Sequence, residues 1–277
     1  MKAKILTLLF FVLIILSVIA YAHGDEEEEV VTEEKIDLDS YLKSTSINYI
    51  LITSLIVIIL VIASTFFKEK TEKMKWLFFL AIIIPIILTT IYTAGSTIYL
   101  NLISETKGPV HWHADYEIWN CDEKIELIKP KGISNRIGSA IFHDHGDNRI
   151  HVEGVVNNKE NVDLHNFFEI VGGDLDKDRL VIPTGQKTVE VKNGDLCNGE
   201  QGKLQVFVYR IINPNDKKGW IFEQKKVEDF PEYILSPYSQ IPPGDCIIIE
   251  FTKDKQETTH ICETYKAAIR RGEVSGS

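Results

Sequence analysis

Three long uncharged stretches constrain the fold of this 277-residue chain more than any other feature of its sequence. They are apolar and cover residues 5–24, 45–67 and 76–104. About 20 apolar residues in a helix are enough to cross the hydrocarbon core of a membrane. Hydrophobic residues make up 44% of the chain, and because many of them are concentrated in these stretches, the sequence excludes a wholly soluble protein.

The first stretch has the pattern of a secretory signal peptide. Two lysines precede an apolar run that ends in an Ala-x-Ala cleavage pattern at Ala22. We therefore predict a signal peptide over residues 1–22, with an uncleaved anchor helix as the alternative. Cleavage after Ala22 would leave His23 first in the mature chain, where its amine and ring nitrogen could chelate copper. The simpler interpretation is that His23 belongs to a flexible spacer.

The second and third stretches predict a transmembrane helical hairpin over residues 49–103. The segment between them, residues 68–75, contains four lysines, and lysine-rich loops face the cytoplasm. The segment before the hairpin, residues 23–48, contains nine acidic residues and two lysines, so we interpret it as an acidic extracytoplasmic spacer. The same orientation places everything after about Ser104 outside the cytoplasm, in a protein of the cell membrane. The alternative, two core helices of a soluble protein, fits these lengths poorly.

Residues 105–277 are expected to form one extracytoplasmic domain. The net charge of the chain is −10, largely from the acidic spacer, and without a basic cluster outside one short loop the chain is a poor nucleic-acid binder. Short β-type runs between turn residues predict an α+β fold that is β-rich, with a mainly antiparallel sheet. The expected strands cover residues 116–119, 149–156, 180–183, 188–192, 204–212 and 246–252. Two helices are expected, over residues 162–171 and 258–271, the second capped by Thr258 or Thr259.

All four cysteines belong to this domain. They are Cys121, Cys197, Cys246 and Cys262. None forms a CxxC pair, which disfavours a structural zinc knuckle. An even number of cysteines in an extracytoplasmic domain predicts two disulfides with three alternative connectivities, and free buried thiols are the other interpretation.

Six of the eight histidines are concentrated in a short part of the domain: His111, His113, His143, His145, His151 and His165. His111 and His113 begin an expected strand, in which alternate residues share a face with Asp115 and Glu117. The residues between them are suited to a core. A second pair, His143 and His145, belongs to a polar turn, and His151 follows on the next expected strand.

Metal coordination is the interpretation that this histidine pattern favours. Imidazole and carboxylate donors with no cysteine or methionine beside them favour Zn(II) or Cu(II). The candidate ligands are His111, His113, His143, His145 and His151. Further candidates for ligands, or for groups that orient the imidazoles, are Glu117, Asp144, Glu153 and His165. A hydrogen-bonded network without metal and a set of unrelated surface histidines stay open as alternatives.

Four ordered motifs also carry a resemblance. They are His111-x-His113, His143-x-His145, Ile150-His151-Val152-Glu153 and Leu164-x-x-Phe167-Phe168, within residues 110–172. This set resembles an uncharacterised group of membrane-anchored extracytoplasmic proteins from bacteria and archaea, in which an HxH strand precedes an HTHD-like turn, an IHVE-like strand and an LxxFF helix. The chain departs from that group at Asp144, where threonine is usual. The resemblance implies a shared metal-binding site and no particular activity. His111-x-His113-x-x-x-Glu117 is also similar to the metal-binding half-motif of cupins, which form β-barrels.

Three functions follow as expectations. The first is a membrane-anchored module that binds zinc or copper outside the cytoplasm, with the lipid bilayer and the metal ion as its partners. The second is a metal-dependent hydrolase or copper oxidase with an open coordination position. The third is a structural or receptor domain that holds no metal.

Overall fold

The computed structural model describes residues 38–67, 69–131, 135–216, 219–235 and 244–277. The chain divides into two compact units, of which the first ends at Leu100 and the second covers Asn101–Ser277. The predicted signal peptide, His23 and the larger part of the predicted acidic spacer lie outside the described residues.

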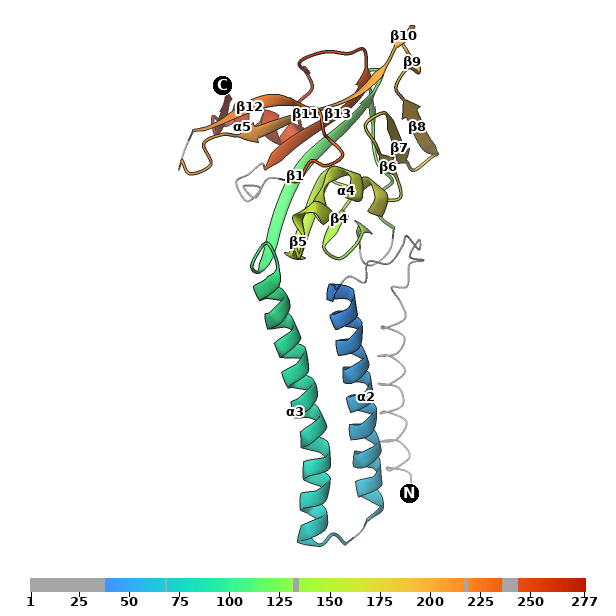
Figure 1. The fold of residues 1–277 in the computed structure, drawn as a ribbon, viewed down its shortest axis with the longest axis vertical. Helices are drawn as coiled ribbons and strands as arrows, with labels where there is room; N and C mark the ends of the chain where they lie inside the picture. Colours follow the sequence, from blue (N-terminus) through green and yellow to red (C-terminus); the bar gives the residue numbers. More distant parts are fainter. Residues whose placement is uncertain (1–37, 68, 132–134, 217–218, 236–243) are drawn as a thin grey trace. The chain divides into compact units, whose positions relative to one another are not determined.

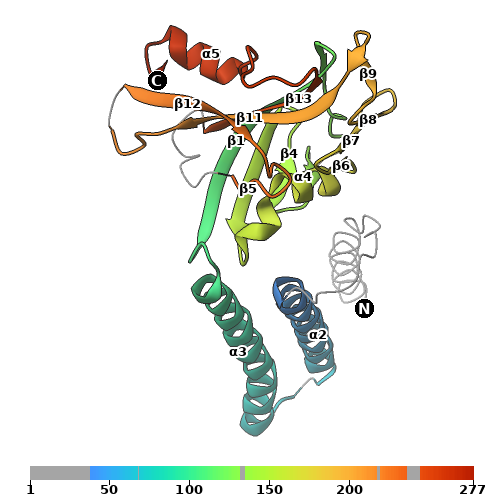
Figure 2. The same cartoon turned by 45° about the horizontal axis from the view of Figure 1, so that its top comes forward.

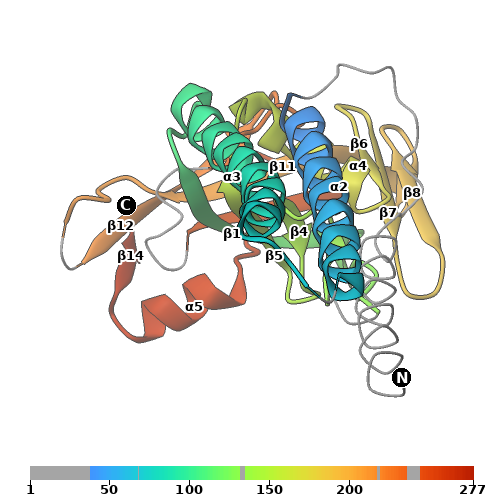
Figure 3. The same cartoon turned by 90° about the horizontal axis from the view of Figure 1, so that it is seen from below.

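Two long apolar helices come first: α2 (Leu38–Phe66) and α3 (Glu72–Ile103) (Figure 1). Both are long and apolar enough to cross a membrane. They lie side by side (Figure 3), where the rings of Tyr49 and Tyr92 meet edge to face with centroids 4.8 Å apart. The helices thus form the expected hairpin, joined by a short loop.

The hairpin differs from the prediction at two of its boundaries. α2 begins at Leu38 rather than near Tyr49, because extending a helix that has already formed costs little once its first turn exists. α3 begins at Glu72, inside the lysine-rich segment 68–75, because the Thr71 hydroxyl accepts the Met74 N–H at 3.4 Å and caps the helix. The last lysines of that segment are therefore helical.

The second unit is built on a mixed sheet of nine strands, counted within the described residues. Its order is β14-β12-β11-β13-β1-β5-β4-β3, with β2 also paired to β1. The bounds are β1 Pro109–Asn120, β2 Glu123–Ile125, β3 Ile137–Gly138, β4 Phe142–Asp144, β5 Arg149–Val155, β11 Lys203–Ile211, β12 Trp220–Val227, β13 Asp245–Thr252 and β14 Val274–Gly276. The pairs β1–β13 and β12–β14 are parallel and the others are antiparallel. The domain is therefore β-rich and its large sheet mainly antiparallel, as expected, but the sheet is mixed.

Smaller elements complete this unit. Two antiparallel sheets contain β6 (Asp174–Leu175), β7 (Arg179–Pro183) and β8 (Thr188–Lys192), and β9 (Leu196–Cys197) with β10 (Glu200–Gln201). The helices are a 3₁₀ turn η1 (Lys159–Val162), α4 (Leu164–Ile170) and α5 (Glu263–Arg270).

Both predicted helices of the domain are present, but each begins later in the sequence than predicted. Asp163 interrupts the first by accepting the Asn166 N–H at 2.8 Å, and so becomes the N-cap of α4. The second begins at Glu263, and its N-cap is Cys262 rather than Thr258 or Thr259. Thr258 is held beside β12 by the hydrogen bond from its N–H to Gln224 Oε1 at 2.9 Å, and its hydroxyl accepts the His260 N–H at 3.0 Å rather than an N–H of the helix.

The two faces of the large sheet pack against different helices (Figure 2). One face of β1, with Trp112 and Tyr116, belongs to the main hydrophobic core together with Phe167 of α4. The opposite face of the sheet packs against α5, where Tyr265 lies in a second core with Phe207. β1 therefore presents its core residues to α4, and its alternate residues to the side occupied by α5.

Two disulfides fix the ends of these strands. Cys121 pairs with Cys197 and Cys246 with Cys262, with Cα atoms 5.3 and 5.8 Å apart. The prediction of two bridges is confirmed, and the structure selects one of the three connectivities. The second bridge ties the start of α5 directly to β13.

Candidate metal centre

Three histidines stand in one row across three neighbouring strands. The register pairs His113 of β1 with His151 of β5, and His151 with His143 of β4. Directly paired residues on adjacent strands point to the same face of a sheet, and the strands lie about 4.7–4.9 Å apart. Strand pairing thus brings together imidazoles from distant parts of the sequence.

Gly138 continues this row onto β3, where it pairs with His143. Its φ is +104°, and a Cβ at this position would lie 2.6 Å from the Phe142 carbonyl oxygen. Glycine is therefore required for β3 to approach β4 closely beside His143.

The row and its neighbours form two groups of metal-ligand type that share His151. We call all of these residues together the histidine cluster. The first group is His111, His113, His151 and Glu153, and the second is His143, His145 and His151. Within each group, one donor atom from every residue lies within 4.8 Å of the others. All five histidines predicted as ligands thus belong to the cluster.

The first group is centred on the Glu153 carboxylate. Its Oε1 lies 2.9 Å from His111 Nε2 and 3.7 Å from His151 Nδ1. The His113 ring lies between these histidines, with centroids 4.5 Å from His111 and 4.7 Å from His151. For a tetrahedral ion with bonds of about 2.0–2.1 Å, neighbouring donors lie roughly 3.3 Å apart, so the distances from Glu153 Oε1 to His111 Nε2 and His151 Nδ1 are close to that geometry.

The second group has its imidazole nitrogens already converged. His143 Nε2 and His145 Nε2 are 3.2 Å apart, close to the same tetrahedral edge of about 3.3 Å. His145 Nδ1 lies 2.5 Å from the Asn135 carbonyl oxygen, which can only accept a hydrogen bond. Neutral His145 must therefore carry its proton on Nδ1, which leaves the Nε2 lone pair free to bind an ion.

Burial leaves several imidazole nitrogens without partners. His143 is 2% exposed and His151 is 8% exposed. His143 Nδ1 and both nitrogens of His151 are buried and have no hydrogen-bond partner among the described residues. A buried polar atom without a partner costs about 1–3 kcal/mol, and coordination would remove that cost at each nitrogen that binds the ion.

The same burial keeps the central imidazoles neutral. It lowers the pKa of His113 and of His143 from 6.5 to about 4, and it also lowers the pKa of His151. A secondary cause is repulsion within the cluster, of His113 by His151 and of His143 by His145. Neutral imidazole is the form that binds metal ions, so at pH 7 these three residues are in the ligand state.

Two carboxylates proposed from the sequence belong to other interactions. Asp144 faces the core, where its Oδ2 accepts a hydrogen bond from the Tyr116 hydroxyl at 2.6 Å. Burial raises the pKa of Asp144. Glu117 is buried, and it binds Lys124 Nζ at 2.9 Å and Trp119 Nε1 at 3.1 Å. Neither belongs to the two groups, and the position of Glu117 gives no support to the cupin alternative.

His165 lies apart, on α4. It forms a separate group of metal-ligand type with Asp174 and Asp176. Its Nδ1 donates to the Leu175 carbonyl oxygen at 2.9 Å, and this hydrogen bond raises its pKa. His165 is therefore explained by its contact with β6 and does not join the cluster.

Asp147 is a site residue that the sequence did not indicate as one. Its Oδ2 lies 3.6 Å from His151 Nε2, because the turn between β4 and β5 folds back beside the strand. In the sequence, Asp147 is recognisable only as part of the turn motif Gly146-Asp147-Asn148. The strand pairing of Asp144 with Ile150 is what places this turn beside His151.

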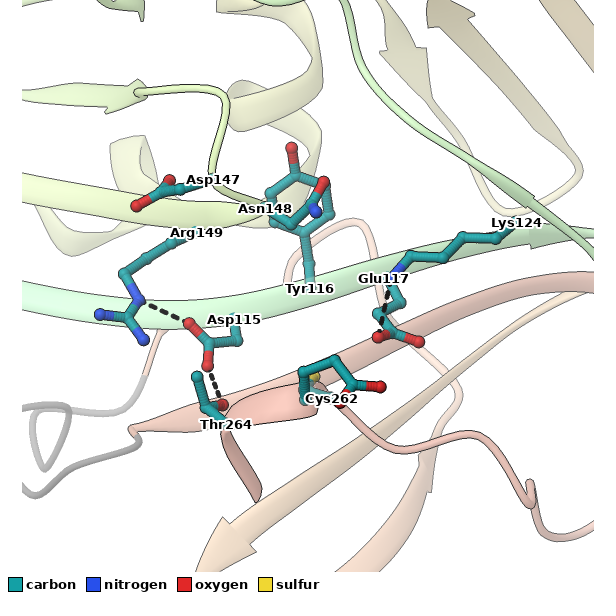
Figure 4. Close-up of a pocket in the computed structure, with 10 residues that line it drawn as sticks. Asp115, Tyr116, Glu117, Lys124, Asp147, Asn148, Arg149, Cys262 and Thr264 are labelled. Carbon is teal, nitrogen blue, oxygen red and sulfur yellow. Dashed lines mark hydrogen bonds and ion pairs between the residues drawn. The ribbon is translucent and has the colours of Figure 1, made fainter. Parts of the chain in front are cut away.

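Asp147 also lines a hollow of about 270 Å³ (Figure 4). Asp115, Arg149 and Thr264 line it, and Asp115 accepts hydrogen bonds from both other residues. The first of these hydrogen bonds raises the pKa of Arg149. The hollow therefore contains a fixed ion pair.

No protein-family profile, curated protein or solved structure matches this chain. The resemblance carried by the four ordered motifs accordingly stays a prediction.

Proposed function

We propose that this protein is a membrane-anchored, extracytoplasmic metal-binding protein that holds zinc or copper in the histidine cluster. The observation that carries the proposal is the row of His113, His151 and His143 across three paired strands. The ring nitrogens of His143 and His145 converge beside the row. The imidazoles of this row are neutral, and some of their buried nitrogens have no hydrogen-bond partner in the described structure. A network built for hydrogen bonding alone would be expected to satisfy those atoms.

The donor set supports zinc or copper over harder ions. Imidazole nitrogens suit Zn(II) and Cu(II), whereas Mg²⁺ and Ca²⁺ prefer oxygen ligands. The carboxylate of Glu153 would partly neutralise the positive charge of a bound ion. The proposed metal is accordingly a divalent transition ion.

The membrane anchor and the outer location rest on three features. Two helices are long and apolar enough to span a bilayer, and all four cysteines are paired in disulfides. Disulfides persist in oxidising compartments outside the cytoplasm. The lysine-rich segment between the helices supports a cytoplasmic loop, which leaves the domain on the outer side.

Metal content of the full chain in detergent micelles tests the binding function. The wild-type chain is loaded with Zn(II) or Cu(II), freed of excess ion and measured by elemental analysis. We expect at least one ion per chain, and none in the double variant His111→Ala with His143→Ala, which removes a donor from each group. His260→Ala is the matched control, because this imidazole stacks on Trp119 and belongs to neither group. A wild-type chain that retains no ion would refute the proposal and favour a structural or receptor domain.

Thiol labelling in intact cells tests the orientation. The native cysteines are all paired, so an introduced cysteine is the one free thiol. A membrane-impermeant maleimide should label Lys187→Cys and leave Glu69→Cys unlabelled. The reverse pattern would place the domain in the cytoplasm.

The second histidine group favours one further candidate, a metal-dependent hydrolase or copper oxidase. Its three imidazoles would leave a fourth position for water or substrate, as in catalytic zinc sites. Asp147, beside His151 Nε2, is placed to accept a proton from a metal-bound water. Zinc-dependent cleavage of a chromogenic ester that is lost in His145→Ala and kept in His260→Ala would support the hydrolase.

A further inference from the structure

We propose that the histidine cluster holds two ions rather than one, and that the His151 ring bridges them. This inference rests on the proposed metal-binding function and deepens it.

The number of donors is the first argument. The cluster offers five imidazoles and one carboxylate, whereas a tetrahedral zinc ion takes four ligands. The donors divide into two groups because His111 and Glu153 pair with each other two residues along β1 and β5 from the row, whereas His145 follows the end of β4 beside His143. The residue common to both groups is His151, in the middle strand.

The two nitrogens of His151 are the second argument. Nδ1 faces the first group, 3.7 Å from Glu153 Oε1. Nε2 is the other ring nitrogen, and it lies 3.6 Å from Asp147 Oδ2, on the turn that follows His145. Both atoms are buried, and neither has a hydrogen-bond partner within the described residues. A metal-ligating histidine usually donates its second N–H to a carboxylate or carbonyl, whereas both nitrogens of this ring lie beyond hydrogen-bond distance of these two carboxylates.

These groups give the two ions different coordination. The first ion would have four protein ligands: His111, His113, His151 Nδ1 and Glu153. The second would have three, His143, His145 and His151 Nε2, and would complete its shell with water. The first site is therefore closed, and the second has an exchangeable position.

Binding of the second ion requires one proton to leave. Neutral His151 carries a single N–H, and this bond breaks as the freed lone pair forms the second metal–nitrogen bond. The proton passes to water, and the ring becomes an imidazolate. Because the ring stands between the ions, they lie farther apart than the roughly 3.5–4 Å of hydrolytic two-metal sites.

Copper titration of the full chain in detergent micelles tests the bridge. Elemental analysis gives the number of ions per chain, and electron paramagnetic resonance reports whether two Cu(II) spins are coupled. We expect two ions per chain, an integrated signal well below two independent spins at low temperature, and a half-field transition. His260→Ala should behave as the wild-type chain does.

Variants at the exposed ends of the cluster separate the two sites without altering the central ring. His111→Ala with Glu153→Gln should leave one ion in the second site, and His145→Ala should leave one ion in the first. Each variant should show a full, uncoupled single-copper signal. Circular dichroism and thermal unfolding check that both remain folded.

The outcomes distinguish the two proposals. A wild-type chain with no ion refutes the metal-binding function itself. One ion per chain leaves that function standing and overturns the two-ion inference. Two ions with independent spins would overturn the bridge.

Discussion

The Tyr116 hydroxyl donates a hydrogen bond to Asp144 at 2.6 Å, on the opposite side of the sheet from the two histidines that flank Asp144 in the sequence. Alternation along β4 explains this placement. Asp144 pairs with Ile150 and shares its core-facing side, while His143 pairs with His151. Asp144, one of the carboxylates that the sequence offered as a candidate ligand, is therefore a buried structural group.

Tyr116→Phe should destabilise the domain without changing its metal content. The substitution leaves the buried Asp144 Oδ2 without its donor, which costs about 1–3 kcal/mol. Urea unfolding and elemental analysis of the same preparation measure the two effects. A loss of metal in a folded Tyr116→Phe chain would show that Asp144 acts on the cluster after all.

Removal of the ion should lower the melting temperature. A ligand at 100 times its dissociation constant stabilises the folded state by about 2.7 kcal/mol, which for a domain of this size is a shift of about 5–10 °C. Thermal unfolding with and without chelator measures the shift. The double variant His111→Ala with His143→Ala should melt at the same temperature in both conditions, whereas His260→Ala should respond as the wild-type chain does.

The metal-free chain should lose stability as the pH falls from about 6.5 to about 4. In the unfolded chain, His113 and His143 take up protons near pH 6.5, whereas in the folded chain their pKa is about 4. Between these values the unfolded state binds more protons, so lowering the pH favours unfolding. Urea midpoints across a pH series, in chelator, measure the slope.

Glutamine substitution provides the control for that slope. His113→Gln with His143→Gln keeps polar side chains of similar size that do not titrate in this range. The slope between pH 4 and 6.5 should become shallower. An unchanged slope would mean that other groups are responsible.

The two disulfides should differ in their contribution. The bridge Cys121–Cys197 spans 76 residues and Cys246–Cys262 spans 16. Chain entropy alone gives about 4.5 kcal/mol for the first and about 3 kcal/mol for the second. Paired alanine variants compared by denaturant unfolding test this order. The reverse order would mean that the anchoring of α5 by Cys262 outweighs loop closure.

Local patterns in the sequence predict those features of the site that depend on a single strand. Alternation along a strand depends only on neighbouring residues, so His111 and His113 could be assigned to one face and Trp112 to the core. The apolar stretches predict the helical hairpin for the same reason, since length and composition are local properties.

Contacts between distant segments could not be predicted in this way. The division of the cluster into two groups depends on the register that pairs His151 with both His113 and His143. That register cannot be read from the sequence of any one strand. The start of α5 at Glu263 likewise depends on a disulfide partner on β13 and on Gln224 of β12, a strand that the sequence did not predict.

The row of His113, His151 and His143 exists in a single alignment of β1, β5 and β4. A slip of one residue along β5 would present Ile150 or Val152 in place of His151 and would turn the imidazole toward the core. A chain with a slipped β5 would therefore bind the ion more weakly than a chain with the correct register. Binding of an ion would in turn favour chains in which β1, β5 and β4 are correctly aligned over chains with a slipped strand.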